Sequence, residues 1–252
     1  MESITSNSNS LIKHLRRLCQ QKKERLRSQQ IILDGEHLID EYSKHSDSPI
    51  EHLFLTPKNK KISRNWKYEN IYEISSDLME KVAPTKTPSG YLAIIKTPKT
   101  GEKRIYQKVL VLDNIQDPGN VGTIIRTCVA AGCEAVILHN CTELWSPKTL
   151  RSSQGIQFSP NIALHEIKAP EAINLFFKKD LWALSLSDKS TNLLHQTFNS
   201  DSYGYILGNE GAGISEEFLK IAKKEIFLPM KNDTESLNVA ICAGIVLYQH
   251  IR

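Results

Sequence analysis

Short apolar runs alternate with amphipathic segments along the whole chain. The apolar runs have the length of strands, and the continuous run at residues 108–115 predicts a strand that is buried on both faces of a sheet. They lie at residues 30–35, 50–56, 90–96, 108–115, 134–139, 180–187, 202–208 and 225–230. The helical patterns lie at residues 9–30, 36–45, 76–83, 120–132, 215–224 and 236–251. This alternation predicts a small α/β module followed by a second α/β domain with a mostly parallel sheet.

The sequences of two predicted helices also indicate how one of them begins and how deeply the other is buried. In residues 215–224, Ser215 stands where a side chain can cap the helix, and Glu216 and Glu217 suit its positive end. Residues 236–251 are apolar nearly all round, which predicts a helix that is buried on every side.

The first helical pattern, residues 9–30, is both amphipathic and basic. Leu11, Leu15 and Leu18 share one face, and Leu26 continues it. Such a pattern is compatible with an ordinary solvated helix and equally with a surface that follows the phosphates of a nucleic acid. The candidate nucleic-acid contacts of this segment are Arg16, Arg17, Lys22 and Lys23.

A change of composition marks a domain boundary. Residues 95–108 are rich in Lys, Thr, Pro and Gly and poor in apolar side chains, as linkers are. We therefore predict one domain over residues 1–98, a linker over 99–108 and a second domain over 109–252. The net charge of +4 is uneven, because the chain before residue 109 is basic and the chain after it is acidic. The basic part is the better candidate for contact with a polyanion.

The composition also argues against several classes of protein. The first ten residues are polar and do not resemble a secretory signal, and no apolar run is as long as a membrane span. The five cysteines form no CxxC pair, which argues against a disulfide framework and favours a reducing cytoplasm. Cys128, Cys133, Cys141 and His139 are irregularly spaced, so we expect buried thiols there and no metal site.

Three unusual loops follow strands of the second domain. They lie at residues 113–127, 208–215 and 229–238, and each leads into a predicted helix. Glycines in these loops permit close approach of backbone to a ligand, and asparagines supply amide donors and acceptors. Because open α/β sheets bind ligands at the carboxyl ends of their strands, we expect the three loops to converge.

The second loop has the spacing of a phosphate-binding loop but lacks its lysine. Gly208 and Gly213 are separated by four residues, and Ile214 stands where the lysine would be. The dinucleotide-binding order GxGxxG is also absent, which disfavours a nucleotide hydrolase or a dehydrogenase. The loop therefore predicts a ligand with a base and a ribose but little phosphate, and S-adenosylmethionine fits that description. Strained turns of a purely structural domain remain compatible with the same glycines.

Three longer segments resemble one enzyme family. Residues 114–132, 205–215 and 226–249 closely resemble, in order and spacing, the three motifs of the SpoU (TrmH-like) RNA ribose methyltransferases of the SPOUT class. Residues 5–18, 32–41 and 85–95 are more weakly similar to the substrate-binding domain that precedes the catalytic domain in many members.

The resemblance implies a fold and a reaction. The expected catalytic domain is a mostly parallel α/β sheet with a deep trefoil knot at its C-terminal end, a rare feature among folds. The expected protein is a cytoplasmic homodimer that transfers a methyl group from S-adenosylmethionine to a ribose 2′-hydroxyl of RNA. Ribosomal RNA is the first expectation. Transfer RNA, and a non-catalytic RNA- or ribosome-binding protein on the same fold, are the alternatives.

The resemblance also implies the residues of the site. Arg126 matches the arginine that acts on the target hydroxyl, and Asn120, Glu210 and Asn238 match the other polar positions. Arg151 matches a stretch that faces RNA. The positions around the cofactor are Leu207, Gly208, Leu228, Met230, Ser236, Leu237 and Asn238.

The chain departs from the family pattern in two places. Ile156, Gln157 and Ser159 interrupt a stretch that is commonly alanine followed by an apolar run, which could alter which nucleotide is presented. Val129 replaces a common acid on the helix surface, a change that should not abolish the chemistry.

Overall fold

A computed structural model describes residues 1–59, 62–99, 101–198, 201–232, 234 and 236–251. Thr100 of the predicted linker and Asp233 and Glu235 of the third motif lie outside these residues. Within the described ranges, no helix is both long enough and apolar enough to cross a membrane.

The chain folds into two compact units. Unit 1 comprises Met1–Lys99 and Trp145–Ser159, and unit 2 comprises Thr100–Leu144 and Pro160–Arg252. The segment 145–159 lies in the sequence range that we predict for the second domain, yet it packs within unit 1. Leu150 is fully buried there, with Trp145 and Phe158 against the same apolar cluster.

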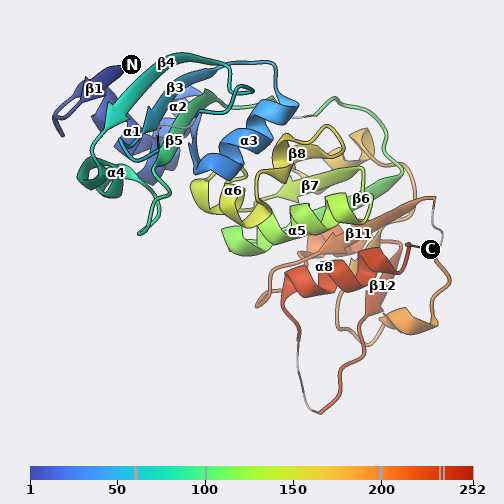
Figure 1. Cartoon of the computed structure of the whole chain (residues 1–252). Coiled ribbons are helices and arrows are strands. Elements are labelled where there is room, and N and C mark those ends of the chain that lie inside the picture. The colour runs from blue at the N-terminus through green and yellow to red at the C-terminus, as the bar shows by residue number, and fades with distance from the viewer. Residues whose placement is uncertain (60–61, 100, 199–200, 233, 235, 252) are drawn as a thin grey trace. The chain divides into compact units, whose positions relative to one another are not determined.

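Unit 1 is a five-stranded mixed sheet with helices around it, in the strand order β1-β4-β3-β5-β2 (Figure 1). Its strands are β1 (Glu2–Ile4), β2 (Gln30–Asp34), β3 (Ile50–Leu55), β4 (Tyr68–Ile74) and β5 (Tyr91–Lys96). Its helices are α1 (Ser10–Gln20), α2 (Lys22–Ser28), α3 (Glu36–His45), α4 (Ser76–Val82) and α6 (Pro147–Ser153), with a 3-10 turn η1 (Ile156–Phe158). The apolar pattern does not predict β1 and β4, because β1 is only three residues long and β4 is mostly polar.

The prediction of one continuous basic helix over residues 9–30 is wrong. Two helices, α1 and α2, meet at Gln21, whose backbone is extended (φ −123°, ψ 113°). The break rotates the second segment, so that Glu24 and Arg25 are buried while Leu26 is 57% exposed. Leu26 therefore does not continue the apolar face of Leu15 and Leu18.

Unit 2 is a seven-stranded, wholly parallel sheet in the order β10-β12-β9-β11-β6-β7-β8. Its strands are β6 (Lys108–Asp113), β7 (Ala135–His139), β8 (Ala163–Ile167), β9 (Trp182–Leu184), β10 (Thr191–Asn192), β11 (Tyr203–Leu207) and β12 (Lys224–Phe227). Its helices are α5 (Pro118–Ala130), α7 (Glu216–Ile221) and α8 (Val239–Tyr248), with 3-10 turns η2 (Pro170–Leu175) and η3 (Leu193–His195). The predicted α/β class, with a smaller α/β module before a mostly parallel sheet, is confirmed. The trefoil knot stays a prediction.

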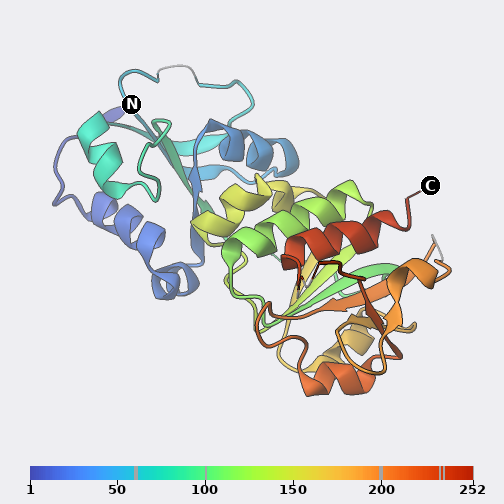
Figure 2. The same ribbon diagram turned by 90° about the horizontal axis from the view of Figure 1, so that it is seen from below.

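Helices cover both faces of this parallel sheet. Figures 1 and 2 show α5 and α8 side by side along one face. The other face packs into an apolar cluster that contains Val109 and Val111 of β6, Ile173 of η2 and Phe218 of α7. Because both faces are buried, the central strands carry continuous apolar runs, which is why their sequence pattern is so clear.

Two expectations about the helices of unit 2 are corrected. Ser215 occupies the N-cap position of α7, but its side chain makes no capping hydrogen bond and its buried Oγ has no partner among the described residues. Helix α8 is not buried on every side, because Ile241 is 54% exposed and Tyr248 is 52% exposed. An apolar helix can present such side chains when one of its faces lies on the surface of the folded chain.

Candidate active site

The predicted convergence of the loops after β6 and β11 is confirmed by hydrogen bonds between them. Asn209 Nδ2 donates to the Asn114 carbonyl oxygen at 3.1 Å. The backbone N–H of Ser215 donates to Asp113 Oδ2 at 2.7 Å. Strands β6 and β11 are direct parallel neighbours, so the loops that follow them leave the sheet at the same edge.

A relay of side chains connects three predicted polar residues. Asn120 Nδ2 donates to Glu210 Oε1, and Asn238 Nδ2 donates to Asn120 Oδ1 at 2.9 Å. Asp117 anchors this relay by accepting the Asn120 backbone N–H at 3.0 Å. Asn238 also caps α8, since its Oδ1 accepts the N–H of Ala240 at 2.9 Å. The first, second and third loops therefore meet at Asn120.

Arg126 lies outside this relay. It is exposed on α5 and has no hydrogen bond or ion pair with any residue in the described part of the chain. The structure thus brings Asn120, Glu210 and Asn238 together and leaves Arg126 apart from them. Its guanidinium is available to a group from outside the chain.

A cavity of about 480 Å³ lies at the carboxyl ends of β9, β11 and β12. Six of the seven predicted cofactor positions line it, and Asn238 is the exception. Those six are Leu207, Gly208, Leu228, Met230, Ser236 and Leu237. Glu210 and Glu225 contribute carboxylates to the wall, whereas its described lining residues include no lysine, arginine or histidine. The cavity is therefore apolar with a negative bias.

Gly208 is required by the close approach of the two ends of its loop. Asn209 and Gly213 exchange both backbone hydrogen bonds, each at 2.9 Å, and fold the loop back upon itself. A Cβ atom on residue 208 would lie 2.3 Å from the carbonyl carbon and oxygen of Gly213. Only glycine leaves room for this turn, so the backbone of the two loop ends packs closely at the cavity wall.

Asp113 is a functional candidate that the sequence motifs did not single out. Its side chain is fully buried, and its Oδ1 accepts hydrogen bonds from His139 Nδ1 at 2.8 Å and Asn114 Nδ2 at 2.9 Å. Its Oδ2 holds the N–H of Ser215, as described above. The carboxylate thus ties together the ends of β6 and β7 and the end of the glycine loop. An acid that terminates a buried apolar run was the available sequence signal.

Replacing Asp113 with asparagine is expected to destabilise the fold and to loosen the glycine loop. An amide offers one acceptor oxygen instead of two, so a buried N–H loses its partner, at a cost of about 1–3 kcal/mol. Denaturant unfolding measures the loss of stability, and calorimetry measures ligand affinity. The exposed variant Asp180→Asn serves as control. Unchanged stability of Asp113→Asn would show that the carboxylate does not hold these strand ends.

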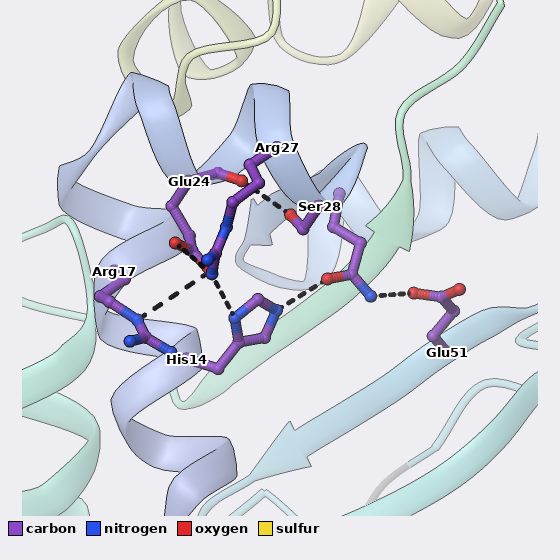
Figure 3. Close-up of polar contacts among 7 residues, drawn as sticks. His14, Arg17, Glu24, Arg27, Ser28 and Glu51 are labelled. Atoms are coloured by element: carbon purple, nitrogen blue, oxygen red, sulfur yellow. Dashed lines mark hydrogen bonds and ion pairs between the residues drawn. The ribbon is translucent and has the colours of Figure 1, made fainter.

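Some of the predicted RNA contacts of unit 1 bond to other side chains of the unit, and others do not. Figure 3 shows Arg27 and His14 directed at the carboxylate of Glu24, with Arg17 Nε 3.9 Å from the same group. Arg16 donates to Asn7 Oδ1 at 2.6 Å. Lys22 and Lys23 are exposed and pair with no carboxylate among the described residues. Of the four predicted contacts in this segment, these two lysines are therefore the most available to phosphates.

Arg151 is likewise engaged within unit 1. Its Nη1 lies 3.3 Å from Oδ2 of Asp34, a carboxylate whose side chain is only 3% exposed. The side chain of Arg151 is 34% exposed, so one edge of the guanidinium still faces solvent. The pair fastens α6 to the end of β2, and the predicted contact of Arg151 with RNA stays a prediction.

Glu24 makes the stability of unit 1 depend on pH. Hydrogen bonds from Arg27, followed by the charges of Arg27, Arg17 and His14, lower the pKa of Glu24 from its ordinary value of 4.5. A lowered pKa stabilises the fold above pH 4.5, and that stabilisation disappears as the pH falls through the folded-state pKa. Glu24→Gln is therefore expected to have a lower melting temperature than the unmodified chain at about pH 7. This difference in melting temperature should become smaller at about pH 3. Thermal melts across this range measure it, with Glu80→Gln as the exposed control. A difference that persists at low pH would contradict the assignment.

The cysteines lie in apolar surroundings. Cys128 and Cys133 are buried, and burial raises the pKa of Cys128 and raises that of Cys141 to about 12. Among the residues that the structure describes, no three His, Cys, Asp or Glu side chains are grouped as metal ligands would be.

Comparisons with known proteins agree with this architecture. Residues 107–248 match the model of the SpoU rRNA Methylase family, and residues 9–93 match the MRM3-like substrate binding domain. The chain is 32% identical over 253 residues to the 23S rRNA (guanosine(2553)-2′-O)-methyltransferase RlmP of Bacillus subtilis, and the similarity spans 100% of both chains.

Solved structures extend the comparison to the fold. The AdoMet-bound rRNA methyltransferase from Sinorhizobium meliloti superposes with a TM-score of 0.83 at 25% identity, covering 99% of this chain and 97% of that chain. The SpoU methyltransferase AviRb from Streptomyces viridochromogenes shares the fold, with a TM-score of 0.82 at 20% identity and coverage of 96% and 97%. The family predicted from the three motifs is confirmed, and the chain belongs to the SpoU rRNA methylase family.

Proposed function

We propose that this protein transfers a methyl group from S-adenosylmethionine to a ribose 2′-hydroxyl of large-subunit ribosomal RNA. The observation that carries the proposal is the asparagine relay, which joins all three family motifs beside a cavity with no lysine among its described lining residues. The full-length similarity to an enzyme named for 2′-O-methylation of 23S rRNA supports the RNA class.

The cavity suits a cationic nucleoside better than a nucleotide. Two carboxylates, Glu210 and Glu225, and no basic side chain stand among its described lining residues. This charge attracts a sulfonium and repels a chain of phosphates. The position that a Cβ would occupy at Gly208 is filled by the carbonyl group of Gly213, so this part of the cavity wall is closely packed backbone. Leu228, Met230 and Leu237 offer apolar walls for an adenine.

Bound S-adenosylmethionine supplies an electrophilic methyl group on its sulfonium. The protein must align the 2′-oxygen with the S–methyl bond, and alignment alone can account for a large part of rate enhancement. Arginine is a poor general base, because a guanidinium group keeps its proton in proteins. The role of Arg126 is to position the ribose and an adjacent RNA phosphate, and to reduce the cost of charge that develops on the 2′-oxygen. The relay of Asn120, Glu210 and Asn238 holds the surrounding loops in place.

The exposed face of α8 supports assembly as a homodimer. Ile241 and Tyr248 expose apolar surface on one side of α8, and a second copy of the chain would remove it from water. Measurement of the mass in solution tests this part of the proposal. A monomer at the concentrations used for the activity assay would contradict it.

RNA is held mainly through its phosphates by exposed lysines of unit 1. The double variant Lys22→Ala, Lys23→Ala is expected to bind RNA of any sequence more weakly. The slope of log Kd against log salt concentration should decrease by about one for each lysine removed. Filter binding or fluorescence anisotropy at several salt concentrations measures both. Lys44 and Lys67 pair with Glu41 and Asp47, so their alanine double variant is a matched control. Equal salt slopes for all three proteins would contradict the contact.

The decisive experiment is methyl transfer from labelled S-adenosylmethionine to RNA from a strain that lacks this gene. Ribosomal and transfer RNA are tested separately, and the modified position is mapped, beginning with the guanosine region that the Bacillus relative modifies. Incorporation into large-subunit RNA supports the proposal. Incorporation into transfer RNA alone would favour the alternative substrate, and binding of RNA without incorporation would favour a non-catalytic protein. Calorimetry with ATP and NAD beside S-adenosylmethionine tests the choice of cofactor.

A further inference from the structure

Glu225 is a carboxylate in the cavity wall that lies outside the three motif loops. It stands on β12, which pairs in parallel with β9 so that Glu225 is opposite Ala183. Its Oε2 accepts hydrogen bonds from Ser185 Oγ at 2.5 Å and from Ser187 Oγ at 2.8 Å. Both serines follow β9 and also line the cavity. Three polar side chains from two neighbouring strands thus meet at one end of the site.

The two serines orient the carboxylate and leave one of its oxygens available. Their hydroxyl protons point at Oε2, whereas Oε1 of Glu225 has no hydrogen bond to any residue that the structure describes. The hydrogen bonds from Ser185 and Ser187, together with the charge of Lys189, lower the pKa of Glu225 and keep it ionised at neutral pH. The cavity therefore carries a charged acceptor oxygen whose direction is set before a ligand binds.

The segment that supplies the serines is itself held by hydrogen bonds. Ser190 Oγ donates to the Ser185 carbonyl oxygen at 2.8 Å and accepts the backbone N–H of Ser187 at the same distance. The backbone N–H of Ser185 donates to the Ile226 carbonyl oxygen at 3.0 Å, which attaches the segment to β12 beside Glu225. Such bracing limits the rearrangement needed on ligand binding, and preorganised sites bind more tightly for that reason.

We propose that Glu225, positioned by Ser185 and Ser187, accepts hydrogen bonds from the ribose hydroxyls of the nucleoside cofactor. This assignment rests on the proposed function, because it takes the cavity to be the S-adenosylmethionine site. Carboxylates in the nucleotide-binding crevices of α/β folds bind ribose hydroxyls in this way, since hydroxyl donors match a charged acceptor. The same charge excludes a phosphate at that position, so Glu225 also selects nucleosides over nucleotides.

The test is calorimetric binding of S-adenosylhomocysteine and of its 2′-deoxy and 3′-deoxy forms to the full chain. Glu225→Gln is expected to weaken binding of the parent compound roughly tenfold, as loss of a hydrogen bond to a charged group does. The unmodified chain should bind at least one deoxy form roughly tenfold more weakly than S-adenosylhomocysteine. Glu225→Gln should bind the deoxy forms nearly as tightly as it binds S-adenosylhomocysteine, because the contact is already lost. The double variant Ser185→Ala, Ser187→Ala should show an intermediate loss. Glu216→Gln, an exposed acid paired with Lys220, is the control.

The outcomes separate this assignment from the proposed function. If Glu225→Gln binds the parent compound as tightly as the unmodified chain, the role of Glu225 is overturned while the function stands. If removal of a ribose hydroxyl weakens binding by the same factor in the unmodified chain and in Glu225→Gln, Glu225 does not contact the ribose and the assignment is overturned. If the unmodified chain binds none of the three compounds, the proposed function fails and the assignment fails with it. Melting temperatures of all variants show that each protein is folded in the assay.

Discussion

Replacing Arg126 with alanine is expected to reduce the rate of methyl transfer roughly 10²–10³-fold at saturating S-adenosylmethionine and RNA. The physical reason is that this guanidinium is exposed and is not engaged by any described residue of its own chain, so its positive charge serves a bound group. The change removes charge stabilisation and alignment of the ribose at the moment of transfer. Single-turnover kinetics with labelled S-adenosylmethionine measures the rate of the chemical step.

Binding measurements separate this catalytic role from a structural one. Because Arg126 does not line the cavity, affinity for S-adenosylhomocysteine should stay within about twofold of the unmodified chain. Arg126→Lys retains the charge but loses the planar guanidinium group. Its rate of methyl transfer should therefore lie between those of the unmodified chain and Arg126→Ala. Arg64→Ala, at an exposed arginine of unit 1, is the control for a general effect of lost charge. Full turnover by Arg126→Ala with RNA and cofactor bound would refute the role.

Replacing Gly208 with alanine is expected to abolish cofactor binding at concentrations that saturate the unmodified chain. The new Cβ would lie 2.3 Å from the Gly213 carbonyl group and 2.4 Å from the Ile214 nitrogen, and all of these atoms are backbone. A flexible side chain cannot move aside to relieve such a contact, so the whole loop must shift. A shift of about 1 Å in a preorganised site is enough to reduce function by about a hundredfold.

Gly211 supplies the matched control within the same loop. A Cβ at residue 211 would have only Asn209 Oδ1 nearby, at 3.6 Å, which is an ordinary contact. Gly211→Ala should therefore bind S-adenosylhomocysteine nearly as well as the unmodified chain, whereas Gly208→Ala should not. Equal affinities for the two variants would show that the close approach of the loop ends does not shape the cofactor site.

Much of the fold was predictable because the central strands of a parallel sheet are buried on both faces. That burial leaves continuous apolar runs, as in β6 and β11, and these runs were assigned correctly. The apolar pattern does not predict the short or polar strands, because β8 has a mixed pattern, β10 has two residues, and β4 is fully buried only at Ile74. Their pairing depends on neighbouring strands rather than on their own composition. The break at Gln21 was missed because the helical pattern of charges continues across it.

The site was predictable in its parts but not in its connections. The glycines and asparagines of three loops, together with the resemblance to one family, indicated the candidate residues. The bond between Asn120 and Glu210 joins residues 90 positions apart, and that between Asn120 and Asn238 joins residues 118 apart. Contacts at such separations depend on the order of strands in the sheet. The roles of Asp113 and Glu225 depend on the same order. The position of Asp113 at the end of a buried apolar run was a local signal, but its partners had none, and Glu225 had no local signal at all.

By itself, the sequence determined the alternation of strands and helices, the two-part organisation and the absence of a lysine from the glycine loop. These are local properties, set by the burial of neighbouring side chains and by the conformational freedom of glycine. Only the tertiary structure decided that Asp113 joins two strand ends to the glycine loop, that Arg126 stands apart from the asparagine relay and that Glu225 faces the cavity. The reason is that hydrogen bonds to a buried or ordered carboxylate need donors placed from several directions at once, and only the folded sheet places them.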